Sequence, residues 1–129
     1  MIIDTSALIA VMRGEDGCDE LMRTLASSTT TRISTGTLLE AGIVIDRLGD
    51  PILGRRLDDL LLAIAVVVEP VTPEHVRVGR QAYRDFGKGS GHPAGLNFGD
   101  CFAYALARTA SEPLLYVGND FGHTDVSSA

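Results

Sequence analysis

Four short apolar segments, separated by stretches with helical periodicity, constrain the fold of this chain more than any other feature. They are too short to assign from periodicity alone, but their flanking residues favour buried strands. The segments are Ile2-Ile3, Arg32-Ile33-Ser34, Ala65-Val66-Val67-Val68 and Leu114-Leu115-Tyr116-Val117. Parallel strands that alternate with helices have both faces covered. The sequence therefore predicts an α/β fold, a three-layer α/β/α sandwich with a short central parallel sheet.

The connecting stretches carry apolar residues one helical turn apart, which is typical of amphipathic helices. The predicted helices cover Cys18 to Leu25, Thr35 to Leu48, the stretch from the Gly49-Asp50-Pro51 turn to Ile64, Thr72 to Phe86 and Asn97 to about Thr109. Thr72-Pro73-Glu74 is a strong start signal, because it combines a hydroxyl cap, a first-turn proline and a first-turn acid. Gly87 to Gly95 is expected to be a flexible surface loop.

Composition limits the class of protein. A chain of 129 residues, of which 45% are hydrophobic, predicts one compact domain over residues 1–129. A net charge of -6 argues against bulk electrostatic binding of nucleic acid, but it leaves room for a local basic patch. Cys18 and Cys101 form no CxxC motif, so we expect a reduced, cytoplasmic protein. The first residues lack a basic segment followed by a signal-length apolar run, so we do not expect secretion. The longest apolar run, Leu60 to Val68, is about half the ~20 residues of a membrane span.

Asp4 directly follows the first apolar segment, at the expected carboxyl end of a strand, where open α/β sheets build their sites. Aspartate is also a favoured N-cap, and a helix that begins at Thr5 would use it in that way. A carboxylate has enough lone pairs for both roles, so both stay open. Ser6 could hold Asp4 or a bound water, or it could be a plain turn hydroxyl.

Two further acids lack the surroundings of ordinary surface residues. Glu40 has no basic residue one turn away on its predicted helix, which favours a partly buried acid over a solvated one. Asp100 could simply form a capping box with Asn97. However, Gly99 beside it costs a helix about 1 kcal/mol relative to alanine. That cost favours close approach by another group, and hence a site role for Asp100.

A fourth acid, Asp120, lies just beyond the last apolar segment, with Asp125 as its competitor. Together with Asp4, Glu40 and Asp100 it would form an all-carboxylate cluster. Carboxylates alone select Mg²⁺ or Mn²⁺, which suit phosphoryl chemistry. The three histidines lack zinc spacing, and no GxxxxGK[ST] or GxGxxG motif is present.

Four blocks of this chain, in order and spacing, resemble a PIN-domain endoribonuclease of the VapC toxin type. The blocks are Ile2 to Leu8, Ser34-Thr35 with Leu39-Glu40-Ala41, Leu96 to Ala105 and Leu114 to Phe121. The resemblance implies hydrolysis of single-stranded or looped RNA by a water that Mg²⁺ or Mn²⁺ activates, leaving a 3′-hydroxyl and a 5′-phosphate. It also implies neutralisation by a cognate VapB antitoxin.

The same resemblance assigns roles to residues. Asp4, Glu40 and Asp100 would bind the metal, Asp120 would complete the acidic pocket, and Ser6 would be the hydroxyl that follows the first acid. Many family members place the fourth acid three residues before the phenylalanine of the last block, where this chain has glycine, so Asp125 remains an alternative to Asp120.

Basic and apolar side chains suggest binding surfaces. Arg13, Lys88 and Arg84 are candidates for holding RNA phosphates, with solvated surface charges as the alternative. Leu39 and Ile43 lie off the main apolar stripe of their predicted helix. They could bind an antitoxin helix or a second copy of the chain, or they could belong to a wide core face. We expect a homodimer, as in the family that the chain resembles.

Two other functions compete with an RNA-cleaving toxin. One is a phosphotransferase with Asp4 as nucleophile, although such enzymes of the haloacid dehalogenase type carry a second aspartate where this chain has Ser6. The other is a degenerate, non-catalytic PIN-like module that binds RNA or protein. The presence of four acids argues against the second alternative.

Overall fold

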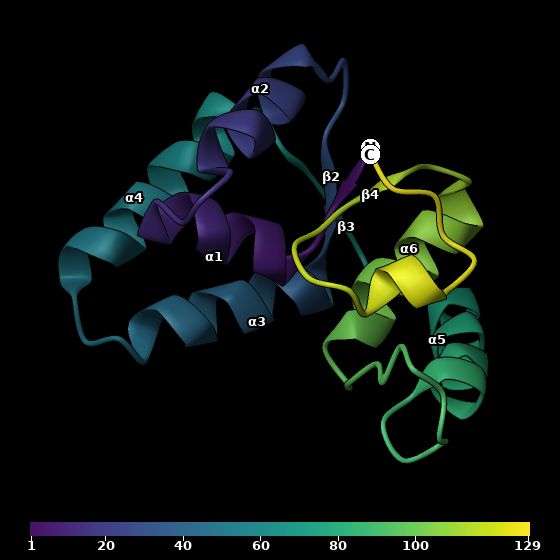
Figure 1. The fold of residues 1–129 in the computed structure, drawn as a ribbon. Coiled ribbons are helices and arrows are strands. Elements are labelled where there is room, and N and C mark those ends of the chain that lie inside the picture. The colour runs from purple at the N-terminus through teal and green to yellow at the C-terminus, as the bar shows by residue number, and fades with distance from the viewer.

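A four-stranded parallel sheet lies at the centre of the computed structural model, which describes residues 1–129 (Figure 1). Its strands are β1 (Ile2–Ile3), β2 (Arg32–Ser34), β3 (Val67–Glu69) and β4 (Leu114–Leu115), in the order β3-β2-β1-β4. Ile2 pairs with Arg32 on one side and with Leu114 on the other. The two fully buried residues of β1 therefore lie in the middle of the sheet.

Helices cover both faces of this sheet and complete the predicted three-layer sandwich. They are α1 (Thr5–Arg13), α2 (Cys18–Ser27), α3 (Thr35–Asp46), α4 (Pro51–Ala63), α5 (Pro73–Phe86) and α6 (Asp100–Ala110), followed by the 3-10 turn η1 (Phe121–His123). Figure 1 shows α1, α2 and α4 on one side of the sheet and α5 and α6 on the other. No helix is long and apolar enough to cross a membrane.

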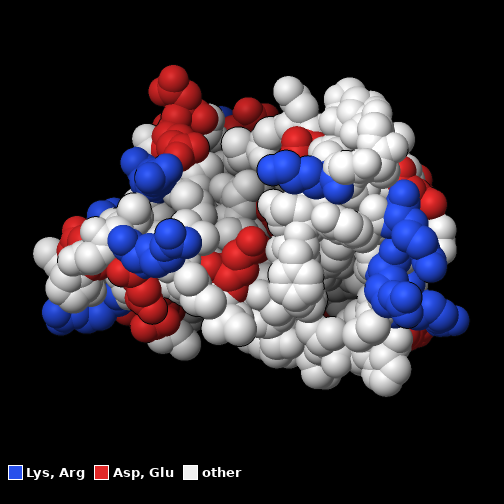
Figure 2. All heavy atoms as spheres, turned by 90° about the horizontal axis from the view of Figure 1, so that it is seen from below, with Lys and Arg blue, Asp and Glu red and all other residues white.

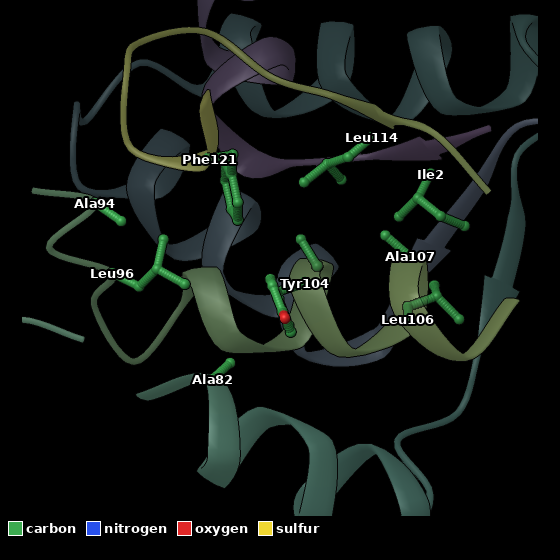
Figure 3. Packing of buried hydrophobic residues seen from close by; sticks show 10 residues of the cluster. Ile2, Ala82, Ala94, Leu96, Tyr104, Leu106, Ala107, Leu114 and Phe121 are labelled. Atoms are coloured by element: carbon green, nitrogen blue, oxygen red, sulfur yellow. The ribbon is translucent and has the colours of Figure 1, made fainter. Parts of the chain in front are cut away.

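Two apolar clusters, one on each face, hold the layers together. The cluster under α6 joins Ile2 and Leu114 of the sheet to Leu106 and Ala107, and Phe121 packs into it from the C-terminal segment (Figure 3). The cluster under α1, α3 and α4 is built around the other residues of the same strands, such as Ile3 and Leu115. Successive strand residues point to opposite faces, so two-residue strands can supply both clusters.

A strand was predicted at Ala65–Val68, and a strand is present there, but it is not buried and its bounds differ. The strand is β3, Val67–Glu69, at the edge of the sheet, and Val67 and Val68 are 41% and 43% exposed. β-branched residues favour strands on an edge as well as in the centre, so their presence did not establish burial. The last strand also ends earlier than predicted, at Leu115.

The helices confirm most of the predicted starts and ends to within a few residues. α5 has the expected cap: the Thr72 hydroxyl accepts from the His75 N–H at 3.2 Å. α3 ends at Asp46, before the predicted Leu48, and α6 starts at Asp100 rather than at Asn97. Helix ends vary by one or two residues with small changes in hydrogen bonding, so these differences leave the layer order unchanged.

Candidate active site

Asp4 combines the two roles that its sequence position allowed. Its backbone N–H donates to the Leu115 carbonyl at 2.9 Å, which places it at the carboxyl edge of β1 and β4. Its side chain caps α1 by accepting from the Ser6 N–H at 2.9 Å. The other carboxylate oxygen, Oδ1, is buried and has no hydrogen-bond partner. The cap therefore uses only part of the carboxylate and leaves one oxygen available for a ligand.

The Ser6 side chain adds a second hydrogen bond to Asp4, beside the one from the Ser6 backbone. The Ser6 hydroxyl donates to Asp4 Oδ2 at 2.6 Å and accepts from the Val117 N–H at 3.0 Å. Val117 follows β4, so this relay ties the segment after the last strand to the carboxylate that follows the first. The contact fits the predicted supporting place of Ser6 beside Asp4.

Glu40, on α3, is half-buried and lies against the start of α6. Its Oε2 accepts from the Thr5 hydroxyl at 2.7 Å. A Cβ atom at Gly99 would collide with the Glu40 carboxylate. Gly99 lies just before α6, so the predicted cost to the helix does not apply, but a neighbouring carboxylate does approach its backbone closely, as predicted.

Asp100 is the first residue of α6 and is locked to Asn97 by two reciprocal hydrogen bonds. The Asn97 N–H donates to Asp100 Oδ2 at 2.7 Å, and the Asp100 N–H donates to Asn97 Oδ1 at 3.0 Å. These are the two bonds that the sequence predicted for a capping box, but they close the turn before α6, whose N-cap is Gly99. Asp100 is thus both fixed by this turn and a wall of the cavity beside it.

Asp4, Glu40 and Asp100 line one cavity of about 290 Å³. The other lining residues are Thr5, Ser6, Ile9, Glu15, Asn97 and Val117, and no lysine or arginine is among them. The sequence did not indicate Glu15, which follows the left-handed Gly14 at the end of α1. Glu15 reaches the cavity because the turn at Gly14 folds back towards it. No local sequence signal predicts that direction.

The cavity disfavours the charged forms of its acids. Burial raises the pKa of Asp100 to about 6, and neighbouring carboxylates add to the rise, whereas the hydrogen bond from the Asn97 backbone opposes it. The contributing charges are those of Asp4, Asp120 and Glu40. Burial also raises the pKa of Asp4, against the hydrogen bonds from Ser6, and the charge of Glu40 raises it further. A bound cation would relieve both the desolvation and the repulsion.

Asp120 and Asp125, the two candidates for a fourth acid, have different surroundings. Asp120 is exposed and does not line the cavity, although its charge contributes to the raised pKa of Asp100. Asp125 accepts from the Tyr104 hydroxyl at 2.6 Å and pairs with Arg108 at 3.3 Å. Asp125 therefore has structural partners, whereas the charge of Asp120 contributes to the raised pKa of Asp100 in the acidic cavity.

The predicted basic contacts lie outside the cavity. Arg13 is exposed at the end of α1, 3.6 Å from Glu15, and Lys88 is exposed in the loop between α5 and α6. That loop is closed at its base, because the Lys88 N–H donates to the Leu96 carbonyl at 2.8 Å. Arg84 donates to Gln81 at 2.8 Å and lines a separate groove between α5 and α6.

The donor set fits a hard cation, although its side chains are not gathered around one point. No group of three or more His, Cys, Asp and Glu side chains is arranged closely enough to hold a metal ion as the side chains stand. The cavity nevertheless offers carboxylates from three elements and the unpartnered Oδ1 of Asp4. Such oxygen donors are those that Mg²⁺ and Mn²⁺ prefer.

The short parallel sheet with acids at its carboxyl edge defines the class of protein: the family model of the PIN domain matches residues 1–127. The chain is 54% identical over 129 residues to Ribonuclease VapC28 of Mycobacterium tuberculosis, covering 100% of this chain and 97% of the relative. The chain therefore belongs to the PIN-domain family, in its VapC ribonuclease toxin branch, as its sequence blocks predicted. The family match decides against an aspartate-nucleophile phosphotransferase.

Solved structures agree with this fold. The crystal structure of Mycobacterium tuberculosis VapC20, a Sarcin-Ricin loop cleaving toxin, superposes with a TM-score of 0.76 at 19% identity and covers 99% of this chain and 97% of that one. A chain of VapBC2 from Rickettsia felis, bound to a DNA fragment from its promoter, superposes with a TM-score of 0.74 at 13% identity, covering 98% and 94%.

Proposed function

We propose that this chain is one nuclease domain, over residues 1–129, that cleaves RNA internally with the help of Mg²⁺ or Mn²⁺. Asp4, Glu40 and Asp100 would hold the cation, and the nearby charge of Asp120 would complete the acidic pocket. The observation that carries the proposal is one cavity lined by Asp4 after β1, Glu40 of α3 and Asp100 of α6, none of which has a basic partner. Buried acids that serve only structure are normally paired, so unpaired ones point to a positive ligand.

The protein's own residues would keep these oxygens in place. Ser6 orients Asp4, Asn97 fixes Asp100 at the first turn of α6, and the missing side chain of Gly99 leaves room for Glu40. When bound, the cation would neutralise phosphate oxygens and lower the pKa of water. The cation would also favour the charged forms of Asp4 and Asp100, whose pKa values are raised by burial.

Substrate phosphates would reach this acidic cavity past basic side chains at its rim. Figure 2 shows acidic side chains in a hollow of one face, with basic side chains on either side of it. Arg13 and Lys88 are the candidates for holding RNA there, since both are exposed and lie outside the cavity. Such local charges would offset the net charge of -6 near the substrate.

An antitoxin of the VapB type and a second copy of the chain are the proposed protein partners, and we place the module in the cytoplasm. The VapBC2 complex of Rickettsia felis supports the first partner. Leu39 is 65% exposed and Ile43 49% exposed on α3, so they are surface residues rather than part of a wide core face. Exposed apolar side chains of this size fit an interface, and homodimerisation would cover some of them.

The direct test is cleavage of RNA by purified full-length protein with Mn²⁺, with EDTA, and with the variant Asp100→Asn. We expect fragments with 5′-phosphate ends from the wild-type protein with Mn²⁺ and none in the other two reactions. Asp125→Asn is the matched control, because Asp125 is held by Tyr104 and Arg108, and this variant should cleave normally. Cleavage that persists in Asp100→Asn would refute the site, and RNA binding without cleavage would indicate a non-catalytic module.

A further inference from the structure

We propose that Thr5 is a positioning residue that holds Glu40 in the acidic cavity, an inference that rests on the proposed metal site. Thr5 is buried at the first position of α1, with 9% of its surface exposed. Its hydroxyl lies 2.7 Å from Glu40 Oε2 and 3.3 Å from the Thr37 carbonyl of α3. The contact joins residues 35 positions apart and connects the helix after β1 to the helix after β2.

The two distances indicate where the single hydroxyl proton goes. A hydroxyl donates one hydrogen, and a carboxylate is a stronger acceptor than a carbonyl. The shorter contact is to Glu40, so Thr5 donates to that carboxylate and lies in looser contact with Thr37. Since Thr5 is the neighbour of Asp4 in the chain, this bond sets the spacing between the first and second acids of the site.

Glu40 needs such a holding contact because its surroundings push it outward. Asp4 and Glu40 line the same cavity, and two carboxylates that close to each other repel when both are charged. No lysine or arginine within hydrogen-bond or ion-pair distance balances Glu40. The Thr5 hydroxyl on one side and the bare backbone of Gly99 on another are the contacts that keep its carboxylate in the cavity.

A neutral donor suits this task better than a basic side chain would. An arginine or lysine would also hold Glu40, but its positive charge would compete with a cation for the carboxylate. A hydroxyl fixes the position of the acid and leaves its negative charge available. Residues that orient metal-binding side chains in this way commonly change metal affinity when they are replaced.

The test is Mn²⁺ affinity of the full-length chain, measured by isothermal titration calorimetry without RNA. Thr5→Val removes the hydroxyl and keeps the shape, and should weaken Mn²⁺ binding about tenfold, whereas Thr5→Ser should stay within about twofold of the wild type. Thr37→Val is the matched control, because Thr37 is a second buried threonine, on α3, whose hydroxyl has no hydrogen-bond partner. That variant should bind Mn²⁺ like the wild type.

A double-mutant cycle separates positioning from general damage. In a Glu40→Gln background, Thr5→Val should cause no further loss of Mn²⁺ affinity, because its target is already altered. At saturating Mn²⁺, the kcat of Thr5→Val for RNA should return to near the wild-type value. If Thr5→Val does not fold, Thr5→Ala takes its place beside Thr5→Ser in the same titration.

The outcomes distinguish this inference from the function on which it rests. Unchanged Mn²⁺ affinity in Thr5→Val, or equal weakening in Thr5→Ser, would overturn the role of the Thr5 hydroxyl while the metal site stands. Equal weakening in Thr37→Val would overturn it as well, by showing a general packing effect. No Mn²⁺ binding by the wild-type chain would refute the metal site itself, and the role of Thr5 with it.

Discussion

The molecule contains two groups of acids that differ in one respect, the presence of a basic partner. In the cavity, Asp4, Glu40 and Asp100 have none. Elsewhere, Arg32 pairs with both Glu69 and Glu112, and Glu112 also pairs with the amino group of Met1; we call these residues the Arg32 network. Arg32 Nε lies 3.0 Å from Glu112 Oε1, and Glu112 also accepts from the amino group. Every acid of the Arg32 network is paired inside the chain.

Under the proposed function, this difference separates acids that stabilise the fold from acids that bind the cation. In the Arg32 network the acids connect β2, β3, the chain start and the segment before β4, which ties the sheet together. In the cavity the carboxylates repel one another, and burial raises the pKa of both Asp4 and Asp100. A fold keeps an arrangement that costs stability when a ligand uses it, so unpaired acids locate the site better than acids in general.

The largest expected effect is the loss of RNA cleavage when an acid of the cavity is neutralised. Asp4→Asn removes a charge from the unpartnered oxygen of the site and should lower the rate of RNA cleavage on the order of a thousandfold, because several kcal/mol of transition-state stabilisation depend on the cation. The measurement is initial cleavage rate with saturating Mn²⁺. Glu112→Gln, its counterpart in the Arg32 network, should cleave at the wild-type rate, and a similar loss in both variants would contradict the division between the two groups.

The second effect is stabilisation by metal, which should depend on pH. Mn²⁺ at about 100 times its dissociation constant should add about 2.7 kcal/mol to the free energy of unfolding, raising the Tm by about 10 °C. Protons compete with the cation for Asp100, whose pKa is about 6. The Tm shift measured by calorimetry should therefore be largest above pH 7 and shrink as the pH falls below 6. A shift that is independent of pH would contradict binding at Asp100.

Without metal, the sign of the Asp100 effect reverses. The pKa of this acid is raised in the folded state above its ordinary value of 3.8. Its contribution to stability is therefore fully present below pH 3.8 and is lost as the pH rises through about 6. With EDTA, Asp100→Asn should raise the Tm at pH 8 and leave it unchanged near pH 4. A lower Tm at pH 8 would show that the charged form of Asp100 stabilises the fold.

A smaller effect is expected in the Arg32 network. Glu112→Gln removes the charge that Met1 and Arg32 share, so it should lower the Tm by a few degrees and leave Mn²⁺ affinity unchanged. The side chain of Glu112 is 26% exposed, and solvent screens part of the loss. Thermal melts with and without Mn²⁺ measure both quantities. A change in the Mn²⁺-induced shift would show that the network and the cavity are coupled.

What could be predicted from the sequence was mostly local. The cap at Asp4, the cap of α5 at Thr72 and the reciprocal bonds between Asn97 and Asp100 depend on residues within one turn, and the structure has all of them. Gly99 was also informative, because a glycine at that position pointed to a close neighbour, which is Glu40, although Gly99 itself precedes α6. These signals act within a few residues and survive in a single sequence.

What could not be predicted depends on long-range packing. The edge position of β3 follows from strand order, which the valines of that strand do not encode. The bond from Thr5 to Glu40 spans 35 positions, and Glu15 reaches the cavity only through the turn after α1. The identity of the fourth acid could not be predicted either, because Asp120 and Asp125 look alike in sequence and differ only in their partners.

The smallest expected effect is the change in cleavage rate that distinguishes Asp120 from Asp125. It extends the comparison of paired and unpaired acids to the C-terminal segment. Asp120 has no partner of its own and its charge reaches Asp100, so Asp120→Asn should lower cleavage about fivefold, as expected for about 1 kcal/mol of screened charge interaction. Asp125→Asn should instead lower the Tm slightly and leave cleavage unchanged, because Tyr104 and Arg108 lose their charged partner. Cleavage rates and Tm values of both variants decide which of the two is the fourth acid of the site. The reverse pattern would make Asp125 the fourth acid and show that pairing within the chain does not exclude an acid from the site.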